Sequence, residues 1–272
     1  MTEPARQGRE LLQEMVEAQT ATPALWWLGH SGFVLKFNGA TLYIDPCLGE
    51  VRGRARTLRP PLEPAQAVNA DLILCTHAHD GHMNPDTLPG MLVASPRSRV
   101  VLPRGVAGHA FRAGVPYERM TTTDADLRVE YVNADSRAII YSIPSAHPNL
   151  DWTEETGYPY LGYIVRLDGF TIYHAGDCRP WDGLVDRLKP YRVSVALLPI
   201  AGAGNTSAAE AAELAEQIGA RWIVPMHYGA FAGEGGEVDR FIDHMLGQRP
   251  EQPFKVFQPG EMWNVPVEAA VL

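Results

Sequence analysis

The chain has 272 residues, of which 46% are hydrophobic and 20% are charged, and its formal net charge is −9. This composition is typical of a globular protein and excludes disorder as the dominant state, because enough apolar surface is present to offset chain entropy. The acidic balance argues against a nucleic-acid-binding protein or a polybasic membrane-surface protein, but it is compatible with a local site for a small anionic substrate.

The sequence also predicts where the protein works. Its apolar runs fall short of the roughly 18 residues that a membrane span needs, and charges are spread through residues 1–20, so we expect neither a membrane segment nor a secretory signal. The three cysteines, Cys47, Cys75 and Cys178, are an odd number without paired spacing. This usage favours a reducing, cytoplasmic compartment.

The first part of the chain predicts one helix followed by strands. Residues 5–19 carry an apolar stripe opposite a charged face, which is the pattern of an amphipathic helix. Asn38-Gly39 between two apolar runs is a strong hairpin signal. Residues 49–66, rich in Arg and Pro, are expected to form a loop. Apolar runs predict strands at residues 25–28, 33–37 and 41–44.

The rest of the chain alternates between expected strands and helices. Strands are predicted at residues 72–75, 100–103, 139–143, 163–167, 171–174, 193–199 and 222–225, with the last ones near 254–265. Helices are predicted at residues 104–113, 180–189, 207–218 and 238–246. Ser207 and Glu210 form a capping-box pattern, which makes the third of these helices the clearest. We expect an N-terminal helix in residues 1–22 and one α/β domain with two sheets over residues 23–272.

Three histidines follow directly on an apolar run, in the sequence His-Ala-His-Asp-Gly-His at residues 77–82. His77 and His79 are two residues apart, so on an extended segment their side chains point the same way. Gly81 is a natural turn residue that would bring His82 back toward them. Neutral imidazole is the commonest metal ligand in proteins, so this cluster predicts a metal site rather than a polar surface loop.

Three further apolar runs lead into a residue of the same chemistry: His147, Asp177 and His227. Loops at the ends of strands are where α/β proteins place their functional residues. Each of these residues alone would be a weak signal. Together with residues 77–82 they predict one convergent metal site.

This ordered set resembles the metallo-β-lactamase superfamily, whose motif His-x-His-x-Asp-His is followed by an isolated His, an Asp and a final His. The resemblance covers about residues 25 to 263 and implies an α/β fold, a four-layer αβ/βα sandwich of two mixed β-sheets flanked by helices. It also implies that Asp45 is a structural residue near the site. The implied metal ligands are His77, His79, His82, His147, Asp177 and His227.

Within the superfamily the chain looks most like the L-ascorbate-6-phosphate lactonase branch. The segments that carry this resemblance are residues 27–33, 161–164, 173–177 and 225–228. They also occur in a wider group of lactonase-like and phosphodiesterase-like hydrolases. The branch implies a homo-oligomer that acts on a small, anionic molecule.

The sequence departs from the family motif at one position, because Gly81 stands where the motif has Asp. In the family that Asp binds one metal and helps to hold the attacking water. Asp80 is adjacent, but a shift of one residue turns a side chain away, so Asp80 is not an automatic substitute. Two interpretations stay open. The site is either a native one, with a reshaped loop from which Asp80 reaches the metal or with one metal only, or a site whose activity is impaired by the loss of the ligand.

The implied chemistry is metal-assisted hydrolysis, in which two metals share Asp177. Such a pair lowers the pKa of a shared water to about 7 and polarises the oxygen under attack. Imidazole-rich sites suit Zn²⁺, and a carboxylate would also admit Mn²⁺, so we expect one or two Zn²⁺ per chain, with Mn²⁺ as the alternative. The first metal is assigned His77, His79 and His147, and the second is assigned His82 and His227.

Other residues are weaker candidates. The catalytic candidates are Asp80, Asp177 and His174. His174 is expected either to orient a ligand or to be a buried polar residue on its strand. His30 is expected to make a structural hydrogen bond, and Cys178 to be packed inside.

The substrate side has five candidates, three of which have a structural alternative. Arg179 could bind a carboxylate or phosphate, or form a surface salt bridge. Trp152 and Tyr160 could wall a pocket or cover the core edge. Asn205 lies in a Gly-rich turn that could hold an anion at a helix N-terminus, and Tyr228 follows a metal-ligand candidate.

Three functions are compatible with these residues. The first is hydrolysis of a small sugar-like or anionic lactone, and the second is hydrolysis of a phosphodiester. The third is a non-catalytic protein that binds a metal or ligand, in which Gly81 marks a decayed site.

Overall fold

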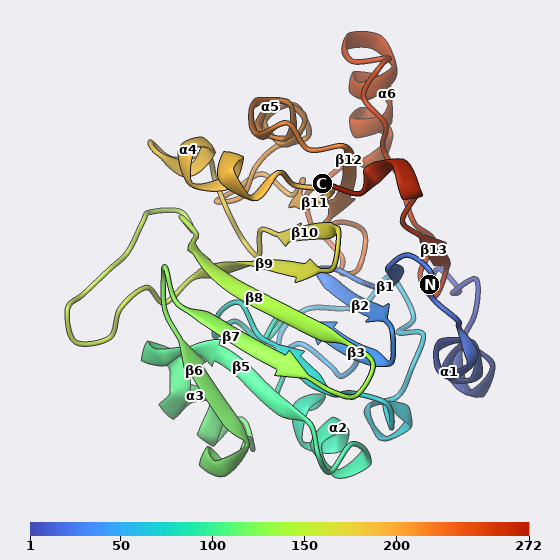
Figure 1. The fold of residues 1–272 in the computed structure, drawn as a ribbon, viewed down its shortest axis with the longest axis vertical. Helices are drawn as coiled ribbons and strands as arrows, with labels where there is room; N and C mark the ends of the chain where they lie inside the picture. Colours follow the sequence, from blue (N-terminus) through green and yellow to red (C-terminus); the bar gives the residue numbers. More distant parts are fainter. Residues whose placement is uncertain (272) are drawn as a thin grey trace.

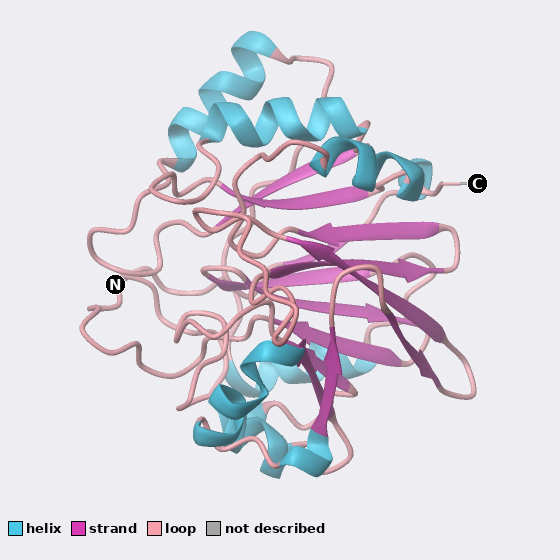
Figure 2. Ribbon diagram, turned by 90° about the vertical axis from the view of Figure 1, so that its left-hand side faces the viewer, coloured by secondary structure: helices cyan, strands magenta, loops and turns pink. Residues whose placement is uncertain are grey.

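The computed structural model describes residues 1–271, which form two β-sheets packed face to face with helices on both outer sides (Figures 1 and 2). The first sheet contains β1 (Ala24–Gly29), β2 (Gly32–Phe37), β3 (Ala40–Ile44), β4 (Leu72–Leu74), β5 (Arg99–Pro103), β6 (Met120–Thr123) and β13 (Met262–Asn264). Its strand order is β13-β1-β2-β3-β4-β5-β6. The pairs are antiparallel from β13 to β3 and parallel from β3 to β6.

The second sheet is also mixed. It contains β7 (Arg128–Val132), β8 (Arg137–Pro144), β9 (Leu161–Leu167), β10 (Phe170–His174), β11 (Val195–Pro199) and β12 (Trp222–Met226). Its strand order is β12-β11-β10-β9-β8-β7, with parallel pairing between β10, β11 and β12 and antiparallel pairing elsewhere. The parallel strands place several strand ends at the same edge of the sheet.

Strands β1 to β3 of the first sheet are largely apolar on both faces, and the two faces belong to different cores. Leu25 and Trp27 of β1 join the large core between the two sheets, whereas Trp26 and Leu28 join a second core under the helices. Successive side chains of a strand point to opposite faces. When both faces of a sheet are covered, successive residues of a strand are all buried, and the strand has a nearly continuous apolar sequence. β1 to β3 are accordingly buried along their whole length.

Helices form the two outer layers (Figure 2). On one side lie α1 (Gly8–Glu17), α2 (Leu88–Ala94) and α3 (Ala107–Arg112), and on the other α4 (Leu184–Leu188), α5 (Ala208–Ile218) and α6 (Val238–Gln248). Single 3₁₀ turns lie at Pro64–Gln66, Arg104–Val106, Tyr117–Arg119, Lys189–Tyr191 and Val267–Ala269. No helix within residues 1–271 is long and apolar enough to cross a membrane.

The predicted capping box is confirmed at α5. The Ser207 side chain accepts a hydrogen bond from the Glu210 backbone N–H, and the Glu210 carboxylate accepts one from the Ser207 backbone N–H. Gly219 follows in the left-handed conformation with φ 70°, as a glycine C-cap does.

The N-terminal helix packs on its own domain. Leu11 and Met15 of α1 are fully buried in the second core, and the Lys36 ammonium donates hydrogen bonds to the carbonyls of Met15 and Val16 at the helix end. The Val16 side chain, which the sequence pattern places on the same stripe, is exposed.

Several predicted elements differ from the structure. The helix expected at residues 180–189 begins only at Leu184, because a turn ending in Gly183, with φ 99°, precedes it. Residues 104–113 divide into a 3₁₀ turn and α3. Of the strands expected near residues 254–265, only β13 forms. The sequence analysis did not predict α2, β6 or β7.

Candidate metal centre

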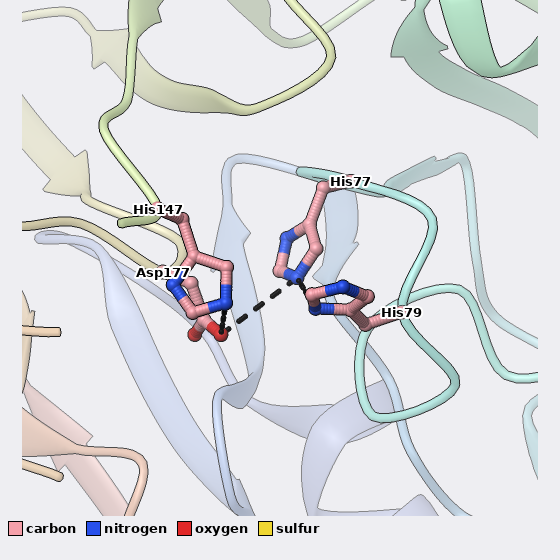
Figure 3. A group of neighbouring side chains, drawn as sticks. All are labelled: His77, His79, His147 and Asp177. Atoms are coloured by element: carbon pink, nitrogen blue, oxygen red, sulfur yellow. Dashed lines mark hydrogen bonds and ion pairs between the residues drawn. The ribbon is translucent and has the colours of Figure 1, made fainter. Parts of the chain in front are cut away.

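The predicted metal ligands meet at one edge of the sandwich, where strands of both sheets end. His77 follows β4 of the first sheet, whereas His147 follows β8, Asp177 follows β10 and His227 follows β12 of the second sheet. Figure 3 shows the side chains of His77, His79, His147 and Asp177 gathered from these separate segments. The convergence of four strand ends that the sequence predicts is therefore present.

Three imidazoles surround one oxygen of Asp177. The Nε2 atoms of His147 and His77 lie 3.4 and 3.7 Å from Asp177 Oδ2. His79 Nδ1 lies 3.0 Å from His77 Nε2. One ligand atom from each of these four residues lies within 4.8 Å of the others, which is close enough for a single ion.

A second group surrounds the other oxygen of the same carboxylate. The Nε2 atoms of His82 and His227 each lie 3.2 Å from Asp177 Oδ1. His30 completes a set of three imidazoles whose ligand atoms are also within 4.8 Å of one another. Asp177 thus stands between two groups of histidines, one on each carboxylate oxygen, which is the arrangement expected of a bridging ligand.

Hydrogen bonds on the far side of the rings fix their orientation. The Asp45 carboxylate lies 2.7 Å from His82 Nδ1, and it also accepts hydrogen bonds from the backbone N–H and the hydroxyl of Thr76. The pairing of Ile44 with Leu74 brings Asp45 alongside Thr76 at the ends of parallel β3 and β4. Because Nδ1 of His82 is engaged, its Nε2 is left facing Asp177.

The Gly-rich turn at residues 201–206 positions another ligand. His147 Nδ1 donates to the Gly204 carbonyl over 3.0 Å, which leaves His147 Nε2 toward Asp177. Gly204 has φ 104°, and a Cβ there would lie 3.4 Å from the His147 ring. The turn therefore holds a histidine, a contact that the sequence analysis did not predict.

His174 orients the loop that carries Asp177. Its Nε2 donates to the Ser31 carbonyl over 2.8 Å, and its Nδ1 accepts from the Gly176 backbone N–H over 3.1 Å. Both ring nitrogens are occupied, so His174 is a positioning residue rather than one that touches substrate or metal. This agrees with one of the two roles expected from the sequence.

The electrostatics of the group follow from burial and close charge pairs. Burial works against the ionised form of Asp177, but His227 and His82 outweigh it and hold the pKa of this carboxyl well below its usual range. Burial also works against protonation of His82 and His227, yet the facing Asp177 raises their pKa values to about 10 and about 9. Burial lowers the pKa of His77 well below its usual range. A metal that binds must therefore displace protons from His82 and His227.

The residues present fit a metal. His82 Nε2 and Asp177 Oδ1 are buried and lack a hydrogen bond of good geometry among the described residues, although they are only 3.2 Å apart. Buried polar atoms without partners are costly, and an ion between them would satisfy both. Imidazole nitrogens and carboxylate oxygens together suit divalent first-row metals.

Of the predicted substrate-binding residues, one packs against the histidines and two are exposed beside them. Tyr160 packs against the centre, with its ring centroid 5.3 Å from that of His77 and 5.4 Å from that of His147. Trp152 is 55% exposed, and Arg179 is exposed in the loop after Asp177. These three residues lie on segments next to the ligands.

Asp80 stays outside the two groups, and two of the predicted substrate-binding residues, Tyr228 and Asn205, are buried. Asp80 joins neither group of metal-ligand candidates within residues 1–271. Tyr228 is buried in the large core and stacks on Trp27 with centroids 4.9 Å apart, and its expected substrate contact stays a prediction. Asn205 is also buried, and Cys178 is packed inside as predicted.

Two residues at the centre were not predicted as part of it. His30, expected to make only a structural hydrogen bond, lies in the second group of histidines. Glu234, whose side chain is 1% exposed, places Oε1 3.3 Å from His227 Nδ1 and 3.1 Å from His30 Nε2. Glu234 lies in an irregular loop between β12 and α6, so no strand end marked it in the sequence.

Comparison with known proteins agrees with this fold and with a metal-dependent hydrolase. The Beta-lactamase superfamily domain matches residues 24–227. A metal-dependent hydrolase of the UPF0173 group from Thermococcus kodakarensis is 30% identical over 236 residues, covering 86% of this chain and 96% of the relative. A UPF0173 metal-dependent hydrolase from Myxococcus xanthus is 29% identical, covering 88% of this chain and 82% of the relative.

A solved structure has the same fold. Igni18, a metallo hydrolase from Ignicoccus hospitalis, superimposes with a TM-score of 0.69 over 89% of this chain and 98% of its own, at 22% identity. The chain belongs to the metallo-β-lactamase superfamily. More particularly, it is a metal-dependent hydrolase of that superfamily, related to the UPF0173 group.

Proposed function

We propose that the chain hydrolyses a small sugar-like or anionic lactone at a centre of two metal ions, with Zn²⁺ as the first choice and Mn²⁺ as the second. The observation that carries the proposal is the position of Asp177, whose two oxygens face two separate groups of imidazoles. The choice of a lactone is supported by the resemblance of residues 27–33 and 173–177 to the lactonase branch.

Each ligand would have a defined task. When bound, the metals would supply hydroxide at neutral pH and polarise the oxygen under attack. Asp177 would hold one ion with each carboxylate oxygen and so offset the repulsion between them. The first ion would be held by His77, His79 and His147, and the second by His82 and His227.

Residues around the ligands would bind and shield the substrate. Tyr160 covers the imidazoles of His77 and His147 and would exclude water from that side. Arg179 is exposed in the loop that follows Asp177. Its planar guanidinium would suit a carboxylate or phosphate group on the lactone.

The test compares two substrate classes on one metal-loaded protein. We expect the protein to open the rings of a panel of sugar lactones, with the rate measured by pH-stat titration. The phosphodiester bis-p-nitrophenyl phosphate should be cleaved more slowly. The Asp177→Asn variant should lose at least about 100-fold in rate, because a ligand shared by two ions is removed.

Two outcomes would contradict the proposal. Cleavage of the phosphodiester without turnover of any lactone would identify a phosphodiesterase. Binding of metal and lactones without turnover of either class would identify a non-catalytic binding protein.

A further inference from the structure

Gly81 is required by space rather than by backbone conformation. Its φ lies outside the left-handed region, so an L residue could adopt the same backbone. A Cβ at this position, however, would lie 2.8 Å from Cε1 of His30, closer than side-chain atoms approach one another. The imidazole of His30 therefore occupies the direction in which the Asp of the family motif would begin.

His30 reaches this place from the turn between β1 and β2, at the same edge of the sandwich. Its backbone is left-handed, with φ 53°, and the residue is 2% exposed. Its ring centroid lies 4.0 Å from that of His227 and 5.0 Å from that of His82. It is the third member of the histidine group whose other members, His82 and His227, face Asp177 Oδ1.

The His30 ring is held on one side by Glu234. Glu234 Oε1 lies 3.1 Å from His30 Nε2, and the other Glu234 oxygen accepts hydrogen bonds from the backbone N–H groups of Ala230 and Phe231, which hold the carboxylate in place. His30 Nδ1 is buried and has no hydrogen-bond partner within residues 1–271. A buried imidazole nitrogen without a partner, beside the rings of two other histidines, is what an unfilled ligand position looks like.

We propose that His30 takes the place of the motif Asp as a ligand of the second metal. Each ion would then have the same donor set: three imidazoles and one oxygen of Asp177. Glu234, next to both His30 and His227, would orient these two rings from behind, as carboxylates do behind metal-bound histidines.

The exchange has a chemical consequence. Replacing a carboxylate ligand by a neutral imidazole removes one negative charge from direct contact with the metals. The metal centre would then carry more positive charge than one with Asp at the motif position, which favours an anionic substrate. The inference rests on the proposed function only in requiring a second metal, not in the choice of lactone.

The test counts metals in four forms of the full-length protein: wild type, His30→Asn, His30→Asn/Gly81→Asp and the control His109→Asn. Asn is chosen because it tolerates the left-handed backbone at residue 30. His109 lies on α3, so its variant removes an imidazole outside both histidine groups. Each form is loaded with Zn²⁺ and passed through gel filtration, and zinc per chain is measured by plasma mass spectrometry.

We expect two zinc equivalents in the wild type and the control, one in His30→Asn, and two again in the double variant. Calorimetric titration with Zn²⁺ should show the second site of His30→Asn weakened by about 10- to 100-fold. Two equivalents of unchanged affinity in His30→Asn would overturn the inference. So would a folded double variant, checked by circular dichroism, that still binds only one. Absence of lactone turnover would contradict the proposed function but would leave these counts unchanged.

Discussion

Asp45 shows how one buried residue outside the ligand set controls the geometry of the centre. Its carboxylate accepts hydrogen bonds from two Thr76 groups and from His82 Nδ1, and it is fully buried. The backbone of Asp45 is left-handed, with φ 46°, a conformation that Asn also tolerates. Asp45→Asn therefore changes the charge behind His82 while keeping shape and backbone.

We expect Asp45→Asn to weaken the second metal site by about 10- to 100-fold and to leave the first site unchanged. The reason is that an amide holds the His82 tautomer less firmly than a carboxylate does. Calorimetric titration with Zn²⁺ would measure both constants. Equal weakening of both sites would show that Asp45 acts on the fold rather than on His82.

At the residue scale, the six candidate ligands could be predicted because four apolar runs lead into them, one of them into the whole segment 77–82. His30 was not predictable as a ligand candidate, because it lies in a two-residue turn and shares no spacing with residues 77–82. Only the folded structure places it beside His82 and His227, where its ring fills the space next to Gly81. The motif position and its replacement are about 50 residues apart in sequence, so no local pattern connects them.

At the scale of elements, the segment between β8 and β9 is held beside the centre by one arginine. The Arg104 guanidinium donates to the carbonyls of Glu154 and Glu155 and to the Asp124 carboxylate, which in turn accepts from the Tyr158 backbone N–H. Burial opposes ionisation of Asp124, but the hydrogen bond from Arg104 and those from the backbone N–H groups of Tyr158 and Ala125 together outweigh it, and the pKa of Asp124 is lowered. The segment includes Trp152 and leads to Tyr160.

We expect Arg104→Ala to loosen residues 148–160, because three hydrogen bonds to this segment or its anchor are lost. Amide hydrogen exchange in residues 148–160 should be at least about threefold faster than in the wild type, while the exchange rates in β10 stay unchanged. Arg112→Ala is the matched control. The pKa of Asp124 is lower in the folded than in the unfolded protein. The stabilisation that ionised Asp124 adds to the fold is therefore fully present above its pKa in the unfolded chain, about 3.9, and is lost as the pH falls through its lower pKa in the folded protein. Unchanged exchange in Arg104→Ala would contradict the anchoring role.

The elements that the sequence did not predict have weak patterns of their own. β6 is Met-Thr-Thr-Thr, with little apolar character, and β7 alternates between exposed and partly buried residues. α2 has Pro89 and Gly90 in its first turn. This pair is typical of a turn, so the sequence of this short helix does not indicate a helix. These elements are stabilised by pairing with a neighbouring strand or by packing on the core. Such tertiary contacts cannot be predicted from the local propensities of the residues.

At the scale of the whole molecule, the two sheets are joined by a hydrogen bond beside the metal centre. The Tyr163 hydroxyl of β9 donates to the Cys75 carbonyl at the end of β4 over 2.8 Å, and both residues are fully buried. Each ligand group draws side chains from both sheets, since His77 follows β4 of the first sheet whereas His147 and His227 follow β8 and β12 of the second. The geometry of the centre therefore depends on how the sheets are held together.

We expect Tyr163→Phe to lower the free energy of unfolding by about 1 to 3 kcal/mol, because the Cys75 carbonyl is left buried without its donor. Urea unfolding monitored by circular dichroism would measure the change. Tyr141→Phe, a partly buried tyrosine on β8, is the control and should cost less. An equal loss in both variants would contradict a special role for the contact between sheets.

The central claim is that one carboxylate, Asp177, holds two metal ions between two groups of histidines. The most direct measurement is the number of metal ions per chain in wild-type protein purified without added metal, by plasma mass spectrometry. The account predicts two equivalents, reduced to one or none in Asp177→Asn. A wild-type protein that holds no metal, even after exposure to Zn²⁺ or Mn²⁺, would contradict it.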